Sequence, residues 1–111
     1  MAESAAALDF LNAAAALAAR LAADGIAVHA LTYQSRAFGG WELEAGRRRT
    51  RIRVTWDGKD RHLRVSTAEL ASGSTAREWQ LAEDHDFRSR RADIVQILGT
   101  AHAAIAAHAG V

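Results

Sequence analysis

The chain has 111 residues, half of them hydrophobic, no cysteine and a formal net charge of +1. This length fits one domain over residues 1–111, and the absence of cysteine excludes disulfides, thiolate nucleophiles and cysteine-ligated zinc. No apolar run approaches the ~20 residues that span a bilayer, and the N-terminus lacks the basic segment of a signal peptide. We therefore expect a cytoplasmic protein, and the alanine-rich, arginine-over-lysine composition is typical of a high-GC bacterial gene.

The hydrophobic content is dominated by 27 alanines. Alanine favours helices but buries little area, so the core depends on ten leucines, five isoleucines, five valines and a few aromatics. Such a thin core makes self-association plausible. We expect all three tryptophans in it, Trp41, Trp56 and Trp79; a tryptophan exposed beside arginines would instead be a contact residue, since both types are frequent at binding hot spots.

Residues 4–24 are predicted to form the first helix, with Ser4 as N-cap and Gly25 as the glycine that ends it. Its apolar stripe is formed by Phe10, Ala14, Leu17 and Leu21 and widened by Leu8 and Leu11. Residues 26–36 follow as a first strand.

A β-hairpin is the clearest structural signal in the chain. Ile52, Val54 and Trp56 alternate with polar residues, as do the residues after the Asp57–Asp60 turn, which indicates strands with one dry face. With Asp57-Gly58 as the turn, Arg51 would face Arg64; with Gly58-Lys59, Arg53 would face Arg64. The second register is preferred because it pairs apolar residues along the whole dry face.

The remaining elements complete an α+β fold. Strands are predicted at 41–45, 49–57 and 61–67, with a turn near Gly46, and residues 78–82 fit either a strand or a helical turn. A last helix covers about 88–108, with Asp86 or Ser89 as its cap and Gly99 allowing a close approach. We expect an N-terminal helix, an antiparallel meander of three to four strands and a C-terminal helix, with both helices on one face of the sheet.

Positive charge is concentrated in the hairpin. Residues 47–64 carry eight basic and two acidic residues, or plus six, so the rest of the chain sums to minus five. This asymmetry indicates an anionic partner or the acidic remainder of the same protein. The candidate partner-binding residues are Arg47, Arg48, Arg49, Arg51, Arg53 and Arg64. Glu42 and Glu44 on the neighbouring strand offer the simpler interpretation, a solvated cross-strand charge ladder.

No residues combine into a recognisable catalytic, metal or cofactor motif, so we expect no enzyme and no cofactor. The cluster Glu83–Asp86 is interpreted as acidic residues before a helix, where the helix dipole favours them. His102 and His108 are six residues apart and do not share a helix face as metal ligands would.

Two functions remain. The first is a non-enzymatic protein-interaction module, such as an adaptor, inhibitor, chaperone or immunity-type protein, whose arginines meet an acidic partner or a second copy. The second is nucleic-acid binding through the same arginines. The helix–strands–helix order resembles that of double-stranded-RNA-binding domains, with Arg88, Arg90 and Arg91 at the place of their basic cluster, but their glycine-rich segment and lysine-rich helix start are absent. A pI of 8.4 favours the first function.

Overall fold

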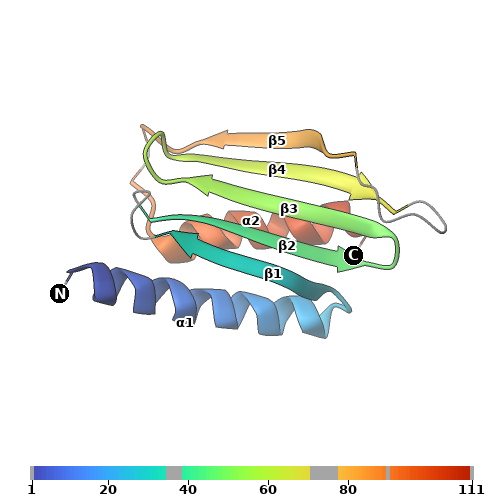
Figure 1. The fold of residues 1–111 in the computed structure, drawn as a ribbon, viewed down its shortest axis with the longest axis horizontal. Coiled ribbons are helices and arrows are strands. Elements are labelled where there is room, and N and C mark those ends of the chain that lie inside the picture. Colours follow the sequence, from blue (N-terminus) through green and yellow to red (C-terminus); the bar gives the residue numbers. More distant parts are fainter. Residues whose placement is uncertain (1, 35–38, 71–77, 90, 111) are drawn as a thin grey trace.

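The computed structural model describes residues 2–34, 39–70, 78–89 and 91–110. Along the chain, a first helix is followed by five strands and then by a second helix (Figure 1). The predicted α+β architecture is confirmed, and the undecided segment at 78–82 belongs to a fifth strand, one more than expected. The elements are α1 (Ala2–Ala23), β1 (Ala27–Gln34), β2 (Gly40–Arg47), β3 (Thr50–Asp57), β4 (His62–Glu69), β5 (Gln80–Asp86) and α2 (Ile94–His108).

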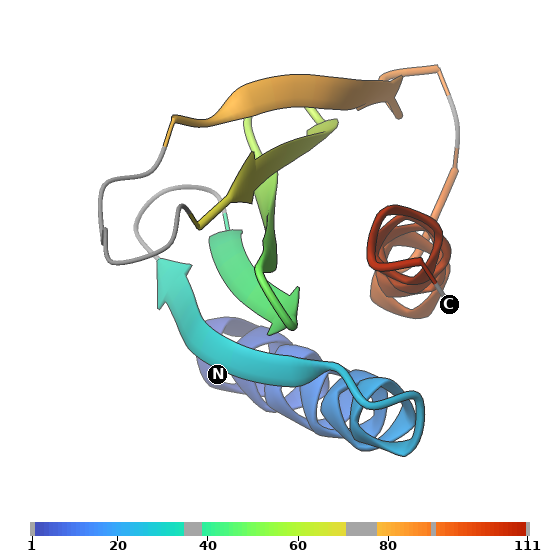
Figure 2. The same cartoon turned by 90° about the vertical axis from the view of Figure 1, so that its right-hand side faces the viewer.

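The strands form one antiparallel sheet in the order β1-β2-β3-β4-β5. Both helices lie on the same side of this twisted sheet, with α1 against β1 and α2 beneath β3 and β4 (Figure 2). Among the described residues, no helix covers the opposite side. We call these two sides the covered face and the open face.

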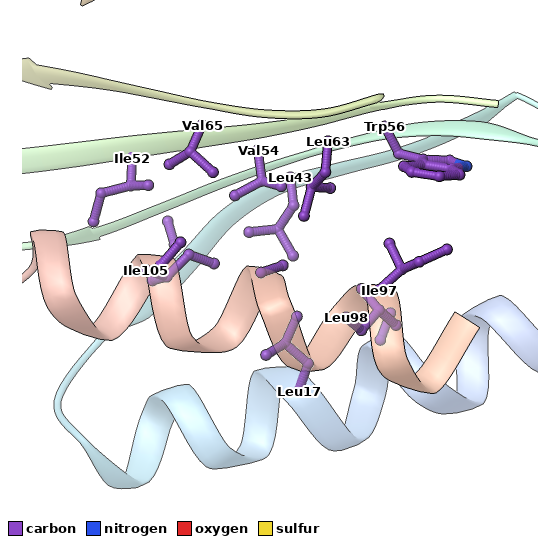
Figure 3. Packing of buried hydrophobic residues seen from close by; sticks show 14 of the residues in the cluster. Leu17, Leu43, Ile52, Val54, Trp56, Leu63, Val65, Ile97, Leu98 and Ile105 are labelled. Atoms are coloured by element: carbon purple, nitrogen blue, oxygen red, sulfur yellow. The ribbon is translucent and has the colours of Figure 1, made fainter. Parts of the chain in front are cut away.

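The core lies between the covered face and the two helices (Figure 3). Ile52, Val54 and Leu63 have no exposed surface, and Trp56 is 7% exposed, so the predicted dry face of the hairpin is confirmed. On the α1 side, Phe10 stacks on Tyr33 at 4.8 Å between ring centroids. Fully burying one large aliphatic side chain stabilises a fold by about 1.5–3 kcal/mol, so these few residues compensate for the small alanines.

Helix α1 ends as predicted but begins earlier. Gly25 adopts a φ of 76°, and the Ile26 amide donates to the Leu21 carbonyl at 2.9 Å, which closes the helix with a left-handed glycine. The helix starts at Ala2, so the predicted N-cap Ser4 lies inside it. The widened stripe was wrong, because Leu8 and Leu11 are 59% and 51% exposed.

Helix α2 begins at Ile94, six residues later than predicted. Asp93 is its N-cap: its side chain accepts from the Gln96 amide at 2.9 Å, and the Gln96 side chain accepts from the Asp93 amide at 2.9 Å. The predicted caps, Asp86 and Ser89, were therefore wrong. Asp93 caps the helix because its capping box satisfies two backbone amides at once. The predicted close approach at Gly99 was wrong, because no atom of a neighbouring element lies within 4 Å of the place where a Cβ would be.

Both predicted hairpin registers were wrong. The β3–β4 turn is four residues long, so Asp57 faces His62, Thr55 faces Arg64 and Arg53 faces Ser66. The Asp57 carboxylate accepts from the amides of residues 59 and 60, at 3.0 and 3.1 Å, and thereby lengthens the turn. This register avoids opposing two arginines, which would repel each other across the strands.

The β2–β3 turn lies at Arg48 and Arg49, not near Gly46. Arg48 has a φ of 58°, and Arg51 Nη1 donates to the Arg48 carbonyl at 2.9 Å and to the Thr50 carbonyl at 3.1 Å. The Arg51 side chain crosses Gly46, where a Cβ would come within 2.5 Å of Nη1. The glycine therefore provides room for a side chain that fastens the turn.

Candidate interaction surface on the open face

The structure divides the six predicted partner-binding arginines among three places. Arg47 points to the covered side, where Nη1 donates to the Ala109 carbonyl at 3.3 Å and joins β2 to the end of α2. Arg48 and Arg49 are exposed in the β2–β3 turn. Only three of the six, Arg51, Arg53 and Arg64, belong to strand positions that face the open side. The expected single arginine face is therefore not formed.

The register sets the composition of the open face. Its three arginines are accompanied by five carboxylates, Glu42, Glu44, Asp57, Asp84 and Asp86. Several of these groups are paired: Arg53 Nε lies 2.8 Å from Glu42 Oε1, and Arg64 Nε lies 3.7 Å from Asp84 Oδ2. Exposed pairs of this kind contribute about 0–1 kcal/mol each. They keep the face soluble without fixing the fold.

These charges are nevertheless separated along the strands. We call the end of the face beside the β2–β3 turn the basic end; it consists of the open-face residues Arg51, Arg53 and Glu44 together with the turn residues Arg48 and Arg49, and it sums to plus three. Two exposed glutamates, Glu69 at the end of β4 and Glu78 just before β5, lie near this end but outside the count. The opposite end, the acidic end, carries four carboxylates and two arginines, or minus two: Glu42, Asp57, Asp84, Asp86, Arg64 and Arg88. In the adjoining turn Lys59 and Asp60 cancel, and Arg61 adds one positive charge that lies against the carbonyls of Phe87 and Ala92, at 3.3 and 3.4 Å.

Trp79 lies at the basic end and not in the core, where it was predicted. It is only partly buried, and the Arg53 guanidinium carbon lies 4.1 Å from the centre of its ring. Such a cation–π contact contributes roughly 0.5–1 kcal/mol at an exposed site. Trp79 is therefore an accessible tryptophan beside an arginine, the arrangement that we expected of a contact residue.

A bulge and two small residues explain this position. The pairing of β4 with β5 shifts between Val65 and Ser66, which turns Leu81 to the open face opposite Ser66, where it is 61% exposed. Trp79 continues this alternation, and the small side chains of Ser66 and Ala68 on β4 leave space for its ring to reach Arg53. A bulge of this kind decides which face of the sheet Trp79 and Leu81 occupy.

The acidic end is organised by β5. His62 Nδ1 lies 2.8 Å from Asp84 Oδ1, and this hydrogen bond is the main cause that lowers the pKa of Asp84. Arg88 Nη2 donates to Asp86 Oδ2 at 2.8 Å and, as the main cause, holds the pKa of Asp86 far below its usual value. Both carboxylates are therefore ionised at neutral pH. Their predicted role beside a helix start was wrong, because they lie in a strand.

Glu83 and His85 alternate with these residues and face the covered side. His85 Nε2 lies 2.8 Å from Glu83 Oε1, and His108 Nε2 of α2 lies 2.6 Å from Glu83 Oε2. The pKa of Glu83 is lowered, chiefly by the hydrogen bond to His85 and further by that to His108. One carboxylate therefore joins the edge strand to the last turn of α2, a contact that sequence spacing did not reveal.

A shallow hollow of about 260 Å³ lies over Gly40, between Gln34, Glu42, Asp57 and Arg64. Within the described ranges, no three histidine, aspartate or glutamate side chains are placed to hold one metal ion. In the part of the chain that the structure describes, neither helix has the length and apolarity to cross a membrane.

Comparison of the chain with protein-family models, with curated proteins and with solved structures found no match. The function of this protein must therefore be inferred from the residues of the open face.

Proposed function

We propose that this protein is a non-enzymatic interaction module that binds an acidic segment of a protein partner at the basic end of its open face. The observation that carries the proposal is the Arg53–Trp79 stack beside the exposed Leu81, on a sheet face that no helix of the described residues covers. Tryptophan and arginine dominate binding hot spots, since a broad apolar ring and a fork of donors act together. Arg48 and Arg49 extend the positive potential beyond the sheet.

Charge and apolar contact have different tasks in this proposal. The exposed arginines of the turn would raise the rate of encounter with an acidic surface, an effect that salt screens. Trp79 and Leu81 would supply the buried area that slows dissociation. The Arg53 guanidinium keeps donors on its other nitrogens while its plane covers the ring, so one carboxylate could bind it without breaking the stack.

Several observations favour a protein partner over a nucleic acid. A nucleic-acid strand running along the whole face would meet five carboxylates against three arginines, whereas a short acidic protein segment at the basic end would meet only Glu44 of these carboxylates. The predicted basic cluster also lacks its expected setting, because Arg88 and Arg91 precede α2 instead of beginning it. Arg88 is, in addition, held by Asp86. Arg90 lies outside the described residues.

The test compares three labelled probes of equal length by fluorescence anisotropy: a peptide alternating glutamate and leucine, the same peptide with lysine, and a uridine-rich single-stranded RNA. We expect the glutamate peptide to bind best. Arg53→Gln and Trp79→Ala should each weaken it about tenfold, equivalent to about 1.4 kcal/mol. The control is Val95→Ala, which removes an apolar side chain 67% exposed on α2, and it should leave binding unchanged.

Circular dichroism of each variant establishes that the fold is retained. Equal binding of the glutamate and lysine peptides would contradict the proposal. Tighter binding of the RNA, with a steep loss of affinity as salt rises, would assign the surface to nucleic acid.

A further inference from the structure

The open face has the charge pattern of a surface that complements itself. Its basic end sums to plus three and its acidic end to minus two. Arg51 and Asp57 mark these ends on β3, six residues apart, which corresponds to roughly 20 Å along a strand. The two ends meet at the Arg53–Glu42 pair, but their outer residues are farther apart than the Debye length of about 8 Å at physiological salt, so the outer charges act separately.

We propose that the acidic segment bound at the basic end is the acidic end of a second copy of this chain. The inference rests on the proposed function and names its partner. Two open faces would pack together about a two-fold axis lying between them and perpendicular to the strands. This axis reverses strand direction, so each basic end lies over an acidic end. An axis parallel to the strands would oppose basic ends to each other.

The charge pairs within one chain do not prevent this exchange. The Arg53–Glu42 and Arg64–Asp84 pairs are exposed, with side-chain exposures between 35% and 48%. Pairs with this degree of side-chain exposure have little net stabilising effect, because solvent weakens their attraction and ordering the side chains costs entropy. Their side chains can therefore turn towards carboxylates and arginines of the partner at small cost.

The size of the face sets the strength of the association. Five strands about 4.8 Å apart and seven or eight residues long make a footprint of roughly 600 Å². Stable complexes bury about 800 Å² per partner, so this dimer should be weak and largely polar. Its dissociation constant should lie in the micromolar range and rise as salt shortens the Debye length from about 10 Å at 0.1 M to about 3 Å at 1 M.

Sedimentation velocity over a concentration series tests the association. At low salt and high concentration we expect the mass to approach twice the 11.9 kDa of the chain, and at high salt to return to the monomer value. A monomer under all these conditions would overturn the inference. Loss of the glutamate-peptide binding in Arg53→Gln would still support the proposed function, so the two failures can be told apart.

Charge reversal identifies the surface. The variant Arg49→Glu/Arg53→Glu has two acidic ends and Asp84→Lys/Asp86→Lys has two basic ends, so each alone should be monomeric. An equimolar mixture should form a heterodimer at low salt. The control Asp9→Lys/Asp24→Lys makes the same change in net charge as Asp84→Lys/Asp86→Lys, at positions in α1 and just after it, away from the open face, and should remain dimeric.

Retained dimers in both reversal variants, or a folded mixture that does not associate, would overturn the inference. Circular dichroism distinguishes these outcomes from unfolding.

Discussion

The two faces of the sheet are made by alternate residues of the same strands, yet their side chains differ in burial and in their effect on stability. On the covered face, Ile52, Val54 and Leu63 are fully buried, and apolar burial of this kind supplies most of the stability. On the open face, their neighbours Arg53 and Arg64 take part in exposed pairs with little effect on stability. We therefore expect that stability and the proposed partner binding can be changed independently within one strand.

Neighbouring residues of β4 give the largest expected contrast. Leu63→Ala removes a side chain with no exposed surface and should lower the free energy of unfolding by about 2–5 kcal/mol. Arg64→Ala, one residue later on the open face, should change it by less than about 0.5 kcal/mol. Urea denaturation of both variants measures the contrast. Similar losses in the two variants would contradict the division between the faces.

Glu83→Gln tests the junction between β5 and α2 on the covered side. Two hydrogen bonds to histidines depend on this carboxylate, so the substitution should cost about 1–3 kcal/mol near neutral pH. The folded-state pKa of Glu83 lies below its ordinary value of 4.5. Its stabilisation is thus present above pH 4.5 and is lost as the pH falls through the folded-state pKa.

Urea denaturation of wild type and Glu83→Gln over a range of pH checks this sign. The difference between them should be largest above pH 4.5 and shrink at more acidic pH. Glu69→Gln serves as control, since this glutamate is exposed at the end of β4. A difference that grows on acidification would contradict the assignment.

Gly99→Ala should stabilise the protein, although glycine in a helix suggests a packing constraint. A Cβ at this position meets no atom within 4 Å, so the substitution removes only the helix penalty of glycine, about 1 kcal/mol. Thermal unfolding followed by circular dichroism should show a higher midpoint. A lower midpoint would indicate a tight contact at Gly99.

The smallest expected effect is the coupling between Arg53 and Trp79 on the open face. A double-mutant cycle with Arg53→Gln and Trp79→Leu should give an interaction energy of about 0.5–1 kcal/mol. Arg53→Gln should, in addition, weaken peptide binding about tenfold. A coupling of several kcal/mol would make the stack part of the folding core and blur the contrast between the faces.

Much of the fold could be predicted from local patterns. Alternation identified the strands around Ile52 and Leu63, and Gly25 marked the end of α1, because both signals act between residues close in sequence. The start of α2 could not be chosen reliably, since Asp86, Ser89 and Asp93 are all chemically suitable caps. The extra bonds made by Gln96 decided among them.

The candidate site was less predictable than the fold. The excess of arginine in residues 47–64 was evident, but its distribution was not, because one residue of register changes the face on which a side chain lies. Arg47 therefore bonds to the carbonyl of Ala109 after α2, and Arg51 bonds to the carbonyl of Arg48 in the β2–β3 turn. Trp79 joined Arg53 through a bulge that pairing with β4 alone reveals.

The sequence by itself determined the type of every element except β5, the dry side of the central hairpin and the amount of charge available, since periodicity and composition are local properties. The tertiary structure decided where that charge lies and which carboxylates pair with the arginines. It also decided that a tryptophan is accessible beside an arginine. The physical reason is that strand register, bulges and helix caps depend on small energy differences between competing partners, which become fixed only when the whole sheet and its two helices pack together.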